Sequence, residues 1–475
     1  MVRKEEIGAI GAAGARFNRR RLLKTGAAAS GMAAFGLIPS TIRAGHFVQA
    51  NATINILAPS WPMNAKEMAL AEEWSKQSGI AVNYEAVNYA SLEQRIKILV
   101  ESKSTDYDVY DYDSQWIGGF VAAGALEQLD TADYLGSADA SVKATDFYPE
   151  IFGPLCQYPS PSFGQTGGAT PEASPTASSS PVYGLPWSIN AEALWYRTDL
   201  MDAAPATWEE LRAKAKELTN DDMFGYAVQG GRDADWIISE TNPIMWGNGG
   251  EIWDQSTYTV QGILNSDVNV ASLQFLVDMV NSDKSIDPAS ANWTITERLG
   301  ALLTGKAAMC LNWSPLFGGV ADDETESQVA GKVGYAVSPK GSNGQAALFG
   351  CQGTGINAWS QHKAEAWQYL QFWQSKETQA ALMDDAPSGF VSARNDLREK
   401  VTHPWQKVFL DSIPYLRDIW NIPEYAQLLQ ILQTELNLAY VGQKESQKAL
   451  DDAAQAQQQV LDSSPGNPKN ATPTA

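Results

Sequence analysis

Tryptophan is the residue whose number and placement first indicate a chemistry for this sequence. All 16 tryptophans lie after residue 60, alongside 17 tyrosines. Five of them stand in turn-like contexts rich in Gly, Pro and Asn: Trp61, Trp116, Trp187, Trp246 and Trp313. Indole rings stack against the apolar C–H faces of sugar rings, while Asn, Gln, Asp and Arg side chains bind hydroxyl groups. The pattern is typical of a cleft that recognises a neutral, hydroxyl-rich molecule.

A packed core is the alternative explanation for these aromatic residues. Six further tryptophans fall on predicted helices or strands, where large side chains usually fill the interior. We expect these six to be core residues: Trp74, Trp195, Trp208, Trp359, Trp367 and Trp373. For the five tryptophans in turns, the sequence leaves both interpretations open.

Motifs of known catalytic sites are missing from the sequence. Residues 51–475 contain two histidines, His362 and His403, and neither has a Ser or Cys nucleophile motif nearby. Serine-hydrolase, zinc-protease, phosphate-binding and calcium-binding motifs are absent as well. Adjacent acids such as Asp221-Asp222 are typical of solvated loops, because the fold rather than adjacency brings a glycosidase pair together. We therefore expect no enzymatic activity, no metal and no cofactor.

The N-terminus has the pattern of an export signal. Arg19 and Arg20 are followed by leucines and a lysine, then by an apolar run over residues 25–40. This order resembles a twin-arginine signal, and the small residues around Ala50 fit a cleavage site. The alternative is a basic N-terminus followed by a chance apolar stretch. We expect export by the twin-arginine route to the periplasm or the outer face of the cytoplasmic membrane.

Composition restricts the mature chain further. Residues 1–50 hold eight Lys/Arg and two Asp/Glu, so residues 51–475 hold 26 and 53, for a formal charge of −27. Such a charge repels phosphate backbones, so we expect no nucleic-acid partner. A chain of this length is longer than one hydrophobic core usually serves, which predicts two domains or lobes. We expect the protein to be a monomer. Whether Cys310 and Cys351 pair stays open.

Strands alternate with helices at the start of the mature chain. Strands are predicted at residues 51–57, 81–84 and 107–110, with helices at 65–77 and 92–102. This alternation indicates an α/β fold with βαβ units and a largely parallel sheet. Similar alternation returns after residue 182, where Thr207 and Glu210 form a capping box at the start of a helix.

Residues 157–182 interrupt this alternation. The segment is rich in Pro, Gly, Ser and Thr and almost free of apolar residues. Such a composition predicts a disordered surface loop. A partner-binding, proline-rich arm is the alternative.

Several motifs, in the same order along the chain, are similar to those of a known family. The matching segments are residues 111–113, 124–130, 183–186, 194–200, 205–211, 305–309, 364–373 and 449–454. Among them, GALEQLD, PATWEEL and GKAAM are the most characteristic. On these motifs the chain resembles the extracellular solute-binding proteins of ABC importers, specifically the carbohydrate-binding group that includes the maltose-binding proteins.

The resemblance implies an α/β, two-lobed periplasmic-binding-protein-like fold (type II), with hinge-linked lobes around a central cleft. The implied partition is a signal peptide at 1–50, lobe 1 at 51–156, the loop at 157–182, lobe 2 at 183–334, a return to lobe 1 at 335–385, C-terminal helices of lobe 2 at 386–462, and a disordered tail at 463–475.

The resemblance also implies which residues face the cleft. They are Trp61, Asp113, Trp116, Trp187, Trp246, Asn248, Trp313, Gln352 and Arg394. Ser114 and Gln115 accompany Asp113 in this set. Arg394 aligns with a Pro-x-Arg segment of the family, but Ser392 replaces the proline. A surface salt bridge is therefore an equal alternative for Arg394.

The expected function is capture of a sugar or oligosaccharide and its delivery to an ABC transporter permease in the membrane. Within binding proteins, the alternatives are a polyamine, an amino acid or a phosphate ester. A cationic ligand would need carboxylates among the aromatic residues, and an anionic ligand would need a basic cleft. An exported carbohydrate-active enzyme is the alternative from another class, and it would need two carboxyl groups astride the sugar site.

Overall fold

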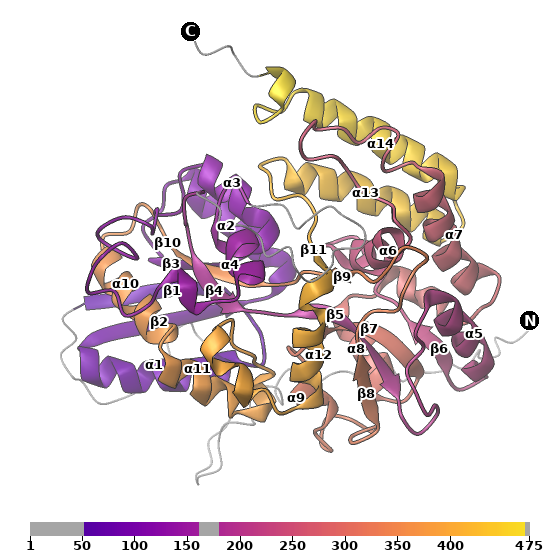
Figure 1. The fold of residues 1–475 in the computed structure, drawn as a ribbon, viewed down its shortest axis with the longest axis horizontal. Coiled ribbons are helices and arrows are strands. Elements are labelled where there is room, and N and C mark those ends of the chain that lie inside the picture. The colour runs from indigo at the N-terminus through magenta and orange to yellow at the C-terminus, as the bar shows by residue number, and fades with distance from the viewer. Residues whose placement is uncertain (1–51, 161–179, 471–475) are drawn as a thin grey trace, which may run out of the picture. The chain divides into compact units, whose positions relative to one another are not determined.

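The computed structural model describes residues 52–160 and 180–470. The predicted signal peptide and residues 161–179 of the predicted loop lie outside the described residues. In the described chain, helices surround two main sheets and a small two-stranded one (Figure 1). The strands are β1 (Ala52–Pro59), β2 (Ile80–Val87), β3 (Val109–Asp113), β4 (Leu185–Ser188), β5 (Ala191–Arg197), β6 (Phe224–Ala227), β7 (Ala307–Ser314), β8 (Val333–Ala336), β9 (Ala347–Leu348), β10 (Gln352–Ile356) and β11 (Leu416–Arg417).

Helices and helical turns account for much of the remaining chain. The α-helices are α1 (Asn64–Ser78), α2 (Tyr89–Glu101), α3 (Ile117–Ala122), α4 (Pro149–Cys156), α5 (Trp208–Leu218), α6 (Trp236–Gly247), α7 (Asp267–Asn281), α8 (Ile295–Leu303), α9 (Gly318–Ala321), α10 (Lys363–Trp373), α11 (Lys376–Met383), α12 (Pro404–Ser412), α13 (Tyr425–Tyr440) and α14 (Ser446–Asp462). Among these helices none is both long and apolar enough to cross a bilayer.

The first sheet has five strands in the order β2-β1-β3-β10-β4. Strand β1 is parallel to both β2 and β3, as the alternating pattern predicts. Strand β10 is antiparallel to β3 and β4, so the expectation of a largely parallel sheet holds only for the first three strands. The reason is that β10 enters the sheet from more than 200 residues downstream, without a βαβ crossover from β3.

The second sheet has four strands in the order β6-β7-β5-β8. Strand β5 lies antiparallel to β7 and β8, while β6 and β7 are parallel. Helix α8 packs against β7, and α12 packs against β5, β7 and β8. Helices α13 and α14 pack on each other and on α7. The lobe boundaries expected from the family resemblance stay a prediction.

Only Ile189 and Asn190 separate β4 of the first sheet from β5 of the second. A second connection runs beside them, because β9 and β10 are separated by three residues. The Gly350 amide of that connection donates to the Asn190 carbonyl at 3.1 Å. Two connections therefore lie side by side at Asn190: one joins β4 to β5 of the second sheet, and the other joins β9 of the small two-stranded sheet to β10.

Local sequence signals explain several element ends. The Thr207 hydroxyl accepts the Glu210 amide at 3.1 Å and caps α5, while Glu210 reaches the Ala206 amide at 2.8 Å. Helix α1 ends at Gly79, whose φ of 73° is left-handed and suits glycine. On α10, Ala366, Leu370 and Trp373 lie on one face of the helix and are buried.

Residues 463–470 differ from the disordered tail expected there. They form a turn and a 3-10 helix (Pro468–Asn470), and Asn467 is buried. The Asn467 side chain donates to the Leu461 carbonyl at 2.9 Å, and that of Asn470 donates to the Asp462 carbonyl at 2.8 Å. These asparagine amides satisfy carbonyls at the end of α14, which composition alone does not reveal.

The chain enters and leaves residues 161–179 at one place. The Tyr158 amide donates to the Pro181 carbonyl at 3.0 Å, and the Tyr183 amide donates to the Cys156 carbonyl at 2.8 Å. The described ends of the predicted loop are thus ordered.

Cys156, Cys310 and Cys351 are buried, unpaired thiols, so Cys310 and Cys351 form no disulfide.

Candidate ligand-binding site

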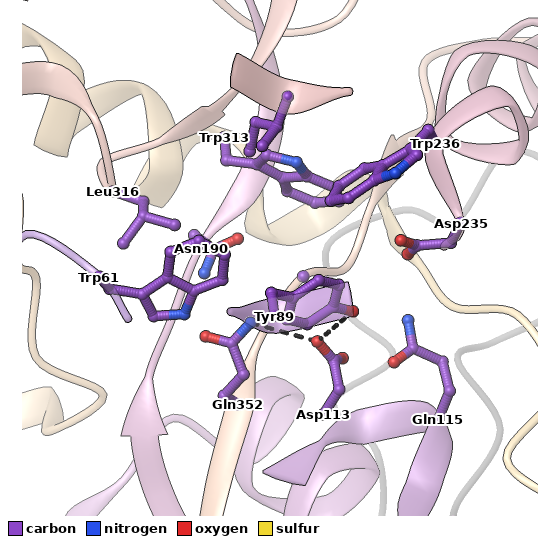
Figure 2. A pocket seen from close by; sticks show the side chains of 12 residues that line it. Trp61, Tyr89, Asp113, Gln115, Asn190, Asp235, Trp236, Trp313, Leu316 and Gln352 are labelled. Carbon is purple, nitrogen blue, oxygen red and sulfur yellow. Dashed lines mark hydrogen bonds between the residues drawn. The ribbon is translucent and has the colours of Figure 1, made fainter. Parts of the chain in front are cut away.

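A pocket lies beside the crossing between the two main sheets and takes residues from both sides (Figure 2). Its volume is about 20 Å³. Twelve residues line it: Trp61, Tyr89, Asp113, Gln115, Asn190, Asp235, Trp236, Ile295, Trp313, Leu316, Gly350 and Gln352. Aromatic rings and amide or carboxyl groups make up most of this lining.

The first wall stands on the five-stranded sheet. Trp61 follows the end of β1, and Asp113 is the last residue of β3. Both positions lie at the carboxyl ends of parallel strands, where ligands bind in open α/β sheets. Tyr89 begins α2, and its hydroxyl donates to Asp113 Oδ2 at 3.0 Å. Gln352 begins β10, and its Nε2 donates to the same oxygen at 3.1 Å.

The second wall belongs to the elements around the four-stranded sheet. Trp313 lies near the end of β7, and Asn190 immediately precedes β5. Trp236 is the first residue of α6, and Ile295 is the first of α8. The Trp236 indole nitrogen donates to Asp233 at 2.6 Å, which fixes the ring at the pocket.

Aromatic contacts connect the two walls. The rings of Trp61 and Tyr89 lie 5.5 Å apart at 31°, and those of Tyr89 and Trp236 lie 5.8 Å apart. Trp61 also meets Phe317 edge-on at 6.0 Å. Behind the pocket, Trp116 stacks on Tyr89 at 5.7 Å. The result is a continuous aromatic surface with several ring faces in one small space.

Four buried polar atoms in the pocket have no hydrogen-bond partner. Two are donors, Trp61 Nε1 and Asn190 Nδ2, and two are acceptors, Gln115 Oε1 and Gln352 Oε1. Leaving such an atom unpaired costs about 1–3 kcal/mol, so buried polar groups normally have partners. A molecule with hydroxyl groups satisfies both kinds, because each hydroxyl donates one hydrogen bond and accepts others.

The acids of the pocket lie in surroundings that favour their protonated forms. Burial raises the pKa of Asp113 well above its usual range, and the nearby Asp235 raises it further. Hydrogen bonds from Gln352 and Tyr89 act in the opposite direction. Burial also raises the pKa of Asp235 to about 6, and that of neighbouring Asp418 to about 7. Asp235 and Asp418 therefore change charge close to neutral pH.

A buried ion cluster supports the second wall. Arg298 on α8 donates from one nitrogen to Glu192 on β5 at 2.9 Å and to Glu240 on α6 at 2.7 Å. Its other terminal nitrogen donates to Asn312 on β7 at 3.2 Å. All three charged side chains are fully buried. The cluster joins α8, β5, α6 and β7, the elements that carry or adjoin Ile295, Asn190, Trp236 and Trp313.

Comparison with known proteins identifies the family to which this arrangement belongs. The model of the bacterial extracellular solute-binding proteins matches residues 60–380. The chain belongs to this family. Among solved structures, a solute-binding protein of an ABC transporter from Agrobacterium radiobacter K84, in complex with ribitol, is 25% identical with a TM-score of 0.72. The match covers 86% of this chain and 99% of that one.

Two further comparisons agree with this assignment. Maltose-bound MalE3 of T. maritima is 22% identical over 86% of this chain and 99% of that one, with a TM-score of 0.71. A probable amino-acid ABC transporter periplasmic-binding protein of Sinorhizobium fredii is 25% identical over 69% of this chain and 70% of that one. The expected α/β, two-lobed fold of the solute-binding proteins is confirmed.

Four of the residues expected to face the cleft of this solute-binding protein line the pocket together. They are Trp61, Asp113, Trp313 and Gln352. Gln115, expected beside Asp113, lines it as well. Trp116 lies outside the lining and stacks on the back of Tyr89. Trp116 is therefore separated from this pocket by the Tyr89 ring, and its expected contact with the ligand stays a prediction.

The structure places Trp187 and Trp246 away from the pocket of the solute-binding protein. The Trp187 indole nitrogen donates to buried Glu67, with distances of 3.2 and 3.3 Å to the two oxygens. The Trp246 ring lies 5.1 Å from the guanidinium of Arg417, a cation–π contact. Both rings are buried, Trp187 on β4 and Trp246 on α6, and neither lines the pocket.

Asn248 and Arg394 also lie outside the pocket. The Asn248 oxygen accepts the Ser342 amide at 2.9 Å, which connects two loops. Arg394 forms a salt bridge with Asp396 at 3.0 Å and donates to the Gln374 carbonyl at 2.9 Å. Arg394 is buried and both ends of its guanidinium have local partners, so it does not line this pocket.

Several lining residues of the solute-binding protein were missed from the sequence. The polar and aromatic ones are Tyr89, Asn190, Asp235 and Trp236. Trp236 follows an acidic turn, Asp233-Ala234-Asp235, and not one of the turns with Gly, Pro or Asn that singled out five other tryptophans. Asn190 has no local signal, since only the crossing of the chain between the two sheets brings it into the pocket.

Proposed function

We propose that this protein captures a sugar or sugar alcohol in the aromatic pocket and delivers it, unaltered, to an ABC transporter permease. The observation that carries the proposal is the combination of three indole rings with four unpartnered polar atoms in one pocket. Apolar ring faces suit the C–H faces of a sugar, and unpaired donors and acceptors suit its hydroxyls. Trp61, Asp113, Trp313 and Gln352 are proposed as ligand contacts, joined by Tyr89 and Trp236.

The family and its relatives support the same proposal. The A. radiobacter relative is in complex with ribitol, and MalE3 is bound to maltose. We propose that the chain acts as a monomer in the periplasm or at the outer face of the cytoplasmic membrane. The Arg19-Arg20 signal supports export by the twin-arginine route.

Ligand entry requires the two walls to move apart. A cavity of about 20 Å³ has room for about one water molecule, not for a sugar ring. Ring contacts such as Tyr89–Trp236 at 5.8 Å occupy the space between the walls. A sugar would replace these contacts by inserting between the rings, and hinge motion at the sheet crossing would make room for it.

A matched pair of variants tests the pocket. Trp313→Phe removes an indole from the pocket, and Trp246→Phe makes the same change in a buried ring outside it. A ligand at one hundred times its Kd stabilises the native protein by about 2.7 kcal/mol. We expect a thermal-shift screen of sugars and sugar alcohols to find stabilising ligands, and calorimetry to give an affinity loss of about tenfold or more for Trp313→Phe only. Equal affinities for the two variants would contradict the proposed site.

The alternative ligands and the alternative enzyme differ in the side chains that they would need in this pocket. Among the twelve lining residues, all in the described part of the chain, none is Lys, Arg or His, so no side chain offers a cationic anchor for a phosphate ester or the carboxylate of an amino acid. Asp113 and Asp235 supply the two carboxyl groups that a glycosidase needs. We expect binding without turnover. Hydrolysis products after incubation with oligosaccharides would establish the enzyme instead.

A further inference from the structure

The polar lining of the pocket has an uneven distribution of charge. Asp113 and Asp235 are both in the lining, and the side chains of both point toward the region between Tyr89 and Gln115 (Figure 2). Both carboxyls are buried, with exposures of 3% and 5%. Among the described residues, neither acid forms a salt bridge. One end of the pocket therefore presents two carboxyl groups and no compensating cation.

Neutral groups hold this acidic end in place. Asp113 Oδ2 accepts from Tyr89 at 3.0 Å and from Gln352 at 3.1 Å. Gln115 Oε1, buried and without a partner, adds a third acceptor at the same end. The rings of Tyr89 and Trp236 lie alongside. Three acceptors beside two aromatic rings form a site that is suited to a cation.

Charges on the surrounding elements do not neutralise the two acids. Glu93 on α2 and Asp418 after β11 add negative charge, and burial holds Tyr89 and Tyr425 in the neutral form. Arg298 on α8 is the cation that acts on Asp235, but its guanidinium is bonded to Glu192 and Glu240. The potential at this end of the pocket is therefore negative whenever the acids are ionised.

We propose that the ligand carries a protonated amino group, which binds between Asp113 and Asp235 against the rings of Tyr89 and Trp236. The ligand class is then an aminated sugar or aminated sugar alcohol, with its hydroxyls on the unpartnered atoms of the remaining pocket. This inference rests on the proposed function of the same pocket. An ammonium group donates three hydrogen bonds and reduces the repulsion between the two carboxylates.

A dependence on pH follows from this arrangement. The ammonium group favours the ionised carboxylates, whereas burial and mutual repulsion favour the protonated forms in the free protein. Binding should therefore release protons. The affinity for an amine should increase as the pH rises from 5 to 8, through the pKa of Asp235 at about 6. The affinity for a neutral sugar alcohol should change little.

Matched ligands test the inference on the full-length protein. D-sorbitol and 1-amino-1-deoxy-D-sorbitol differ only by a hydroxyl against an ammonium group, and D-glucose and D-glucosamine form a second pair. We expect calorimetry, at pH 8 for the sorbitol pair and at pH 7 for the glucose pair so that the amine is protonated, to give at least about tenfold tighter binding of the amine in one pair, with a smaller difference at pH 5. Calorimetry in two buffers of different ionisation enthalpy should show the released protons.

Variants separate the acidic end from the rest of the pocket. Asp235→Asn should bring the ratio of the two Kd values within a pair close to one and remove its pH dependence. Asp221→Asn makes the same charge change at an exposed loop and should leave the preference intact. A preference that survives in Asp235→Asn and Asp113→Asn overturns the inference, as does tighter binding of the neutral member.

The remaining outcomes distinguish this inference from the proposed function. Binding of the neutral members alone overturns the amine proposal and leaves sugar binding standing. Putrescine has amino groups but no hydroxyls. If it binds more tightly than every aminated sugar, the unpartnered polar atoms of the pocket do not bind ligand hydroxyls as proposed. Absence of binding across both pairs, together with no hit in the wider sugar screen, refutes the proposed function itself.

Discussion

Replacing Arg298 with methionine perturbs the ion cluster behind the second wall. The guanidinium donates to Glu192 at 2.9 Å and to Glu240 at 2.7 Å, and all three side chains have no exposed surface. Methionine keeps most of the apolar volume and removes the charge. Two buried carboxyls then face each other without a cation. The native state must either hold unpaired charges or bind additional protons.

The expected loss of stability follows from this geometry. A hydrogen bond to a charged group contributes about 1.5–3 kcal/mol, and the three that Arg298 donates to Glu192, Glu240 and Asn312 are lost. Removing one partner of a buried ion pair costs about 3–5 kcal/mol, and we expect Arg298→Met to fall in that range at pH 7. Even with Arg298 present, burial raises the pKa of Glu192 to about 8. Without Arg298 both glutamates bind protons more tightly, so the loss should be smaller at pH 5 and larger at pH 8.

Urea denaturation at pH 5, 7 and 8 measures this effect. The control is the triple variant Glu192→Gln, Glu240→Gln, Arg298→Met, in which no charge remains to be compensated. We expect the triple variant to recover most of the loss, because removal of every buried charge of a cluster is often nearly neutral. A loss below about 1 kcal/mol for Arg298→Met, or one independent of pH, would refute the argument that the guanidinium compensates two buried acids.

Two further predictions concern Glu67 and Gly350. Burial raises the pKa of Glu67 from 4.5 to about 7, so its stabilising contribution is complete below pH 4.5 and lost as the pH rises through 7. That shift corresponds to about 3 kcal/mol in the free energy of unfolding. In urea denaturation, Glu67→Gln should therefore reduce the change of this free energy between pH 4.5 and 7. An unchanged pH dependence in the variant would contradict the prediction. A Cβ on Gly350 would lie 2.3 Å from the Trp313 ring and 2.5 Å from Asn190 Oδ1. Gly350→Ala should therefore displace both side chains and weaken ligand binding by about tenfold or more in calorimetry, and unchanged affinity would argue against the pocket.

Much of the fold was predictable because its signals are local. The alternation over residues 51–110 predicts β1 to β3 with their helices, and Thr207 marks the start of α5. The antiparallel entry of β10 was not predictable in this way. Its neighbours are β3 and β4, and no feature of Gln352–Ile356 states which strand it will join or in which direction. Pairing over such a distance depends on the whole chain.

The candidate site was predictable only in part, for a related reason. Trp61 and Trp313 combine a turn context with a position at the end of a strand, and both line the pocket. Trp187 and Trp246 have a similar context, but their partners, Glu67 and Arg417, are distant in sequence. Trp236 begins a helix, where an aromatic residue is equally typical of a core position. Turn context alone does not show which face of a ring remains available.

The two backbone hydrogen bonds at Tyr158 and Tyr183 give the protein a natural grafting position. They hold the chain together where it departs after Cys156 and where it comes back at Pro181. A passenger domain inserted between residues 160 and 180 would need only adjacent termini of its own, since the host supplies two neighbouring attachment points. The residues that line the pocket belong to other segments of the chain. A fluorescent passenger at this position would therefore label the protein without replacing any residue that lines the pocket.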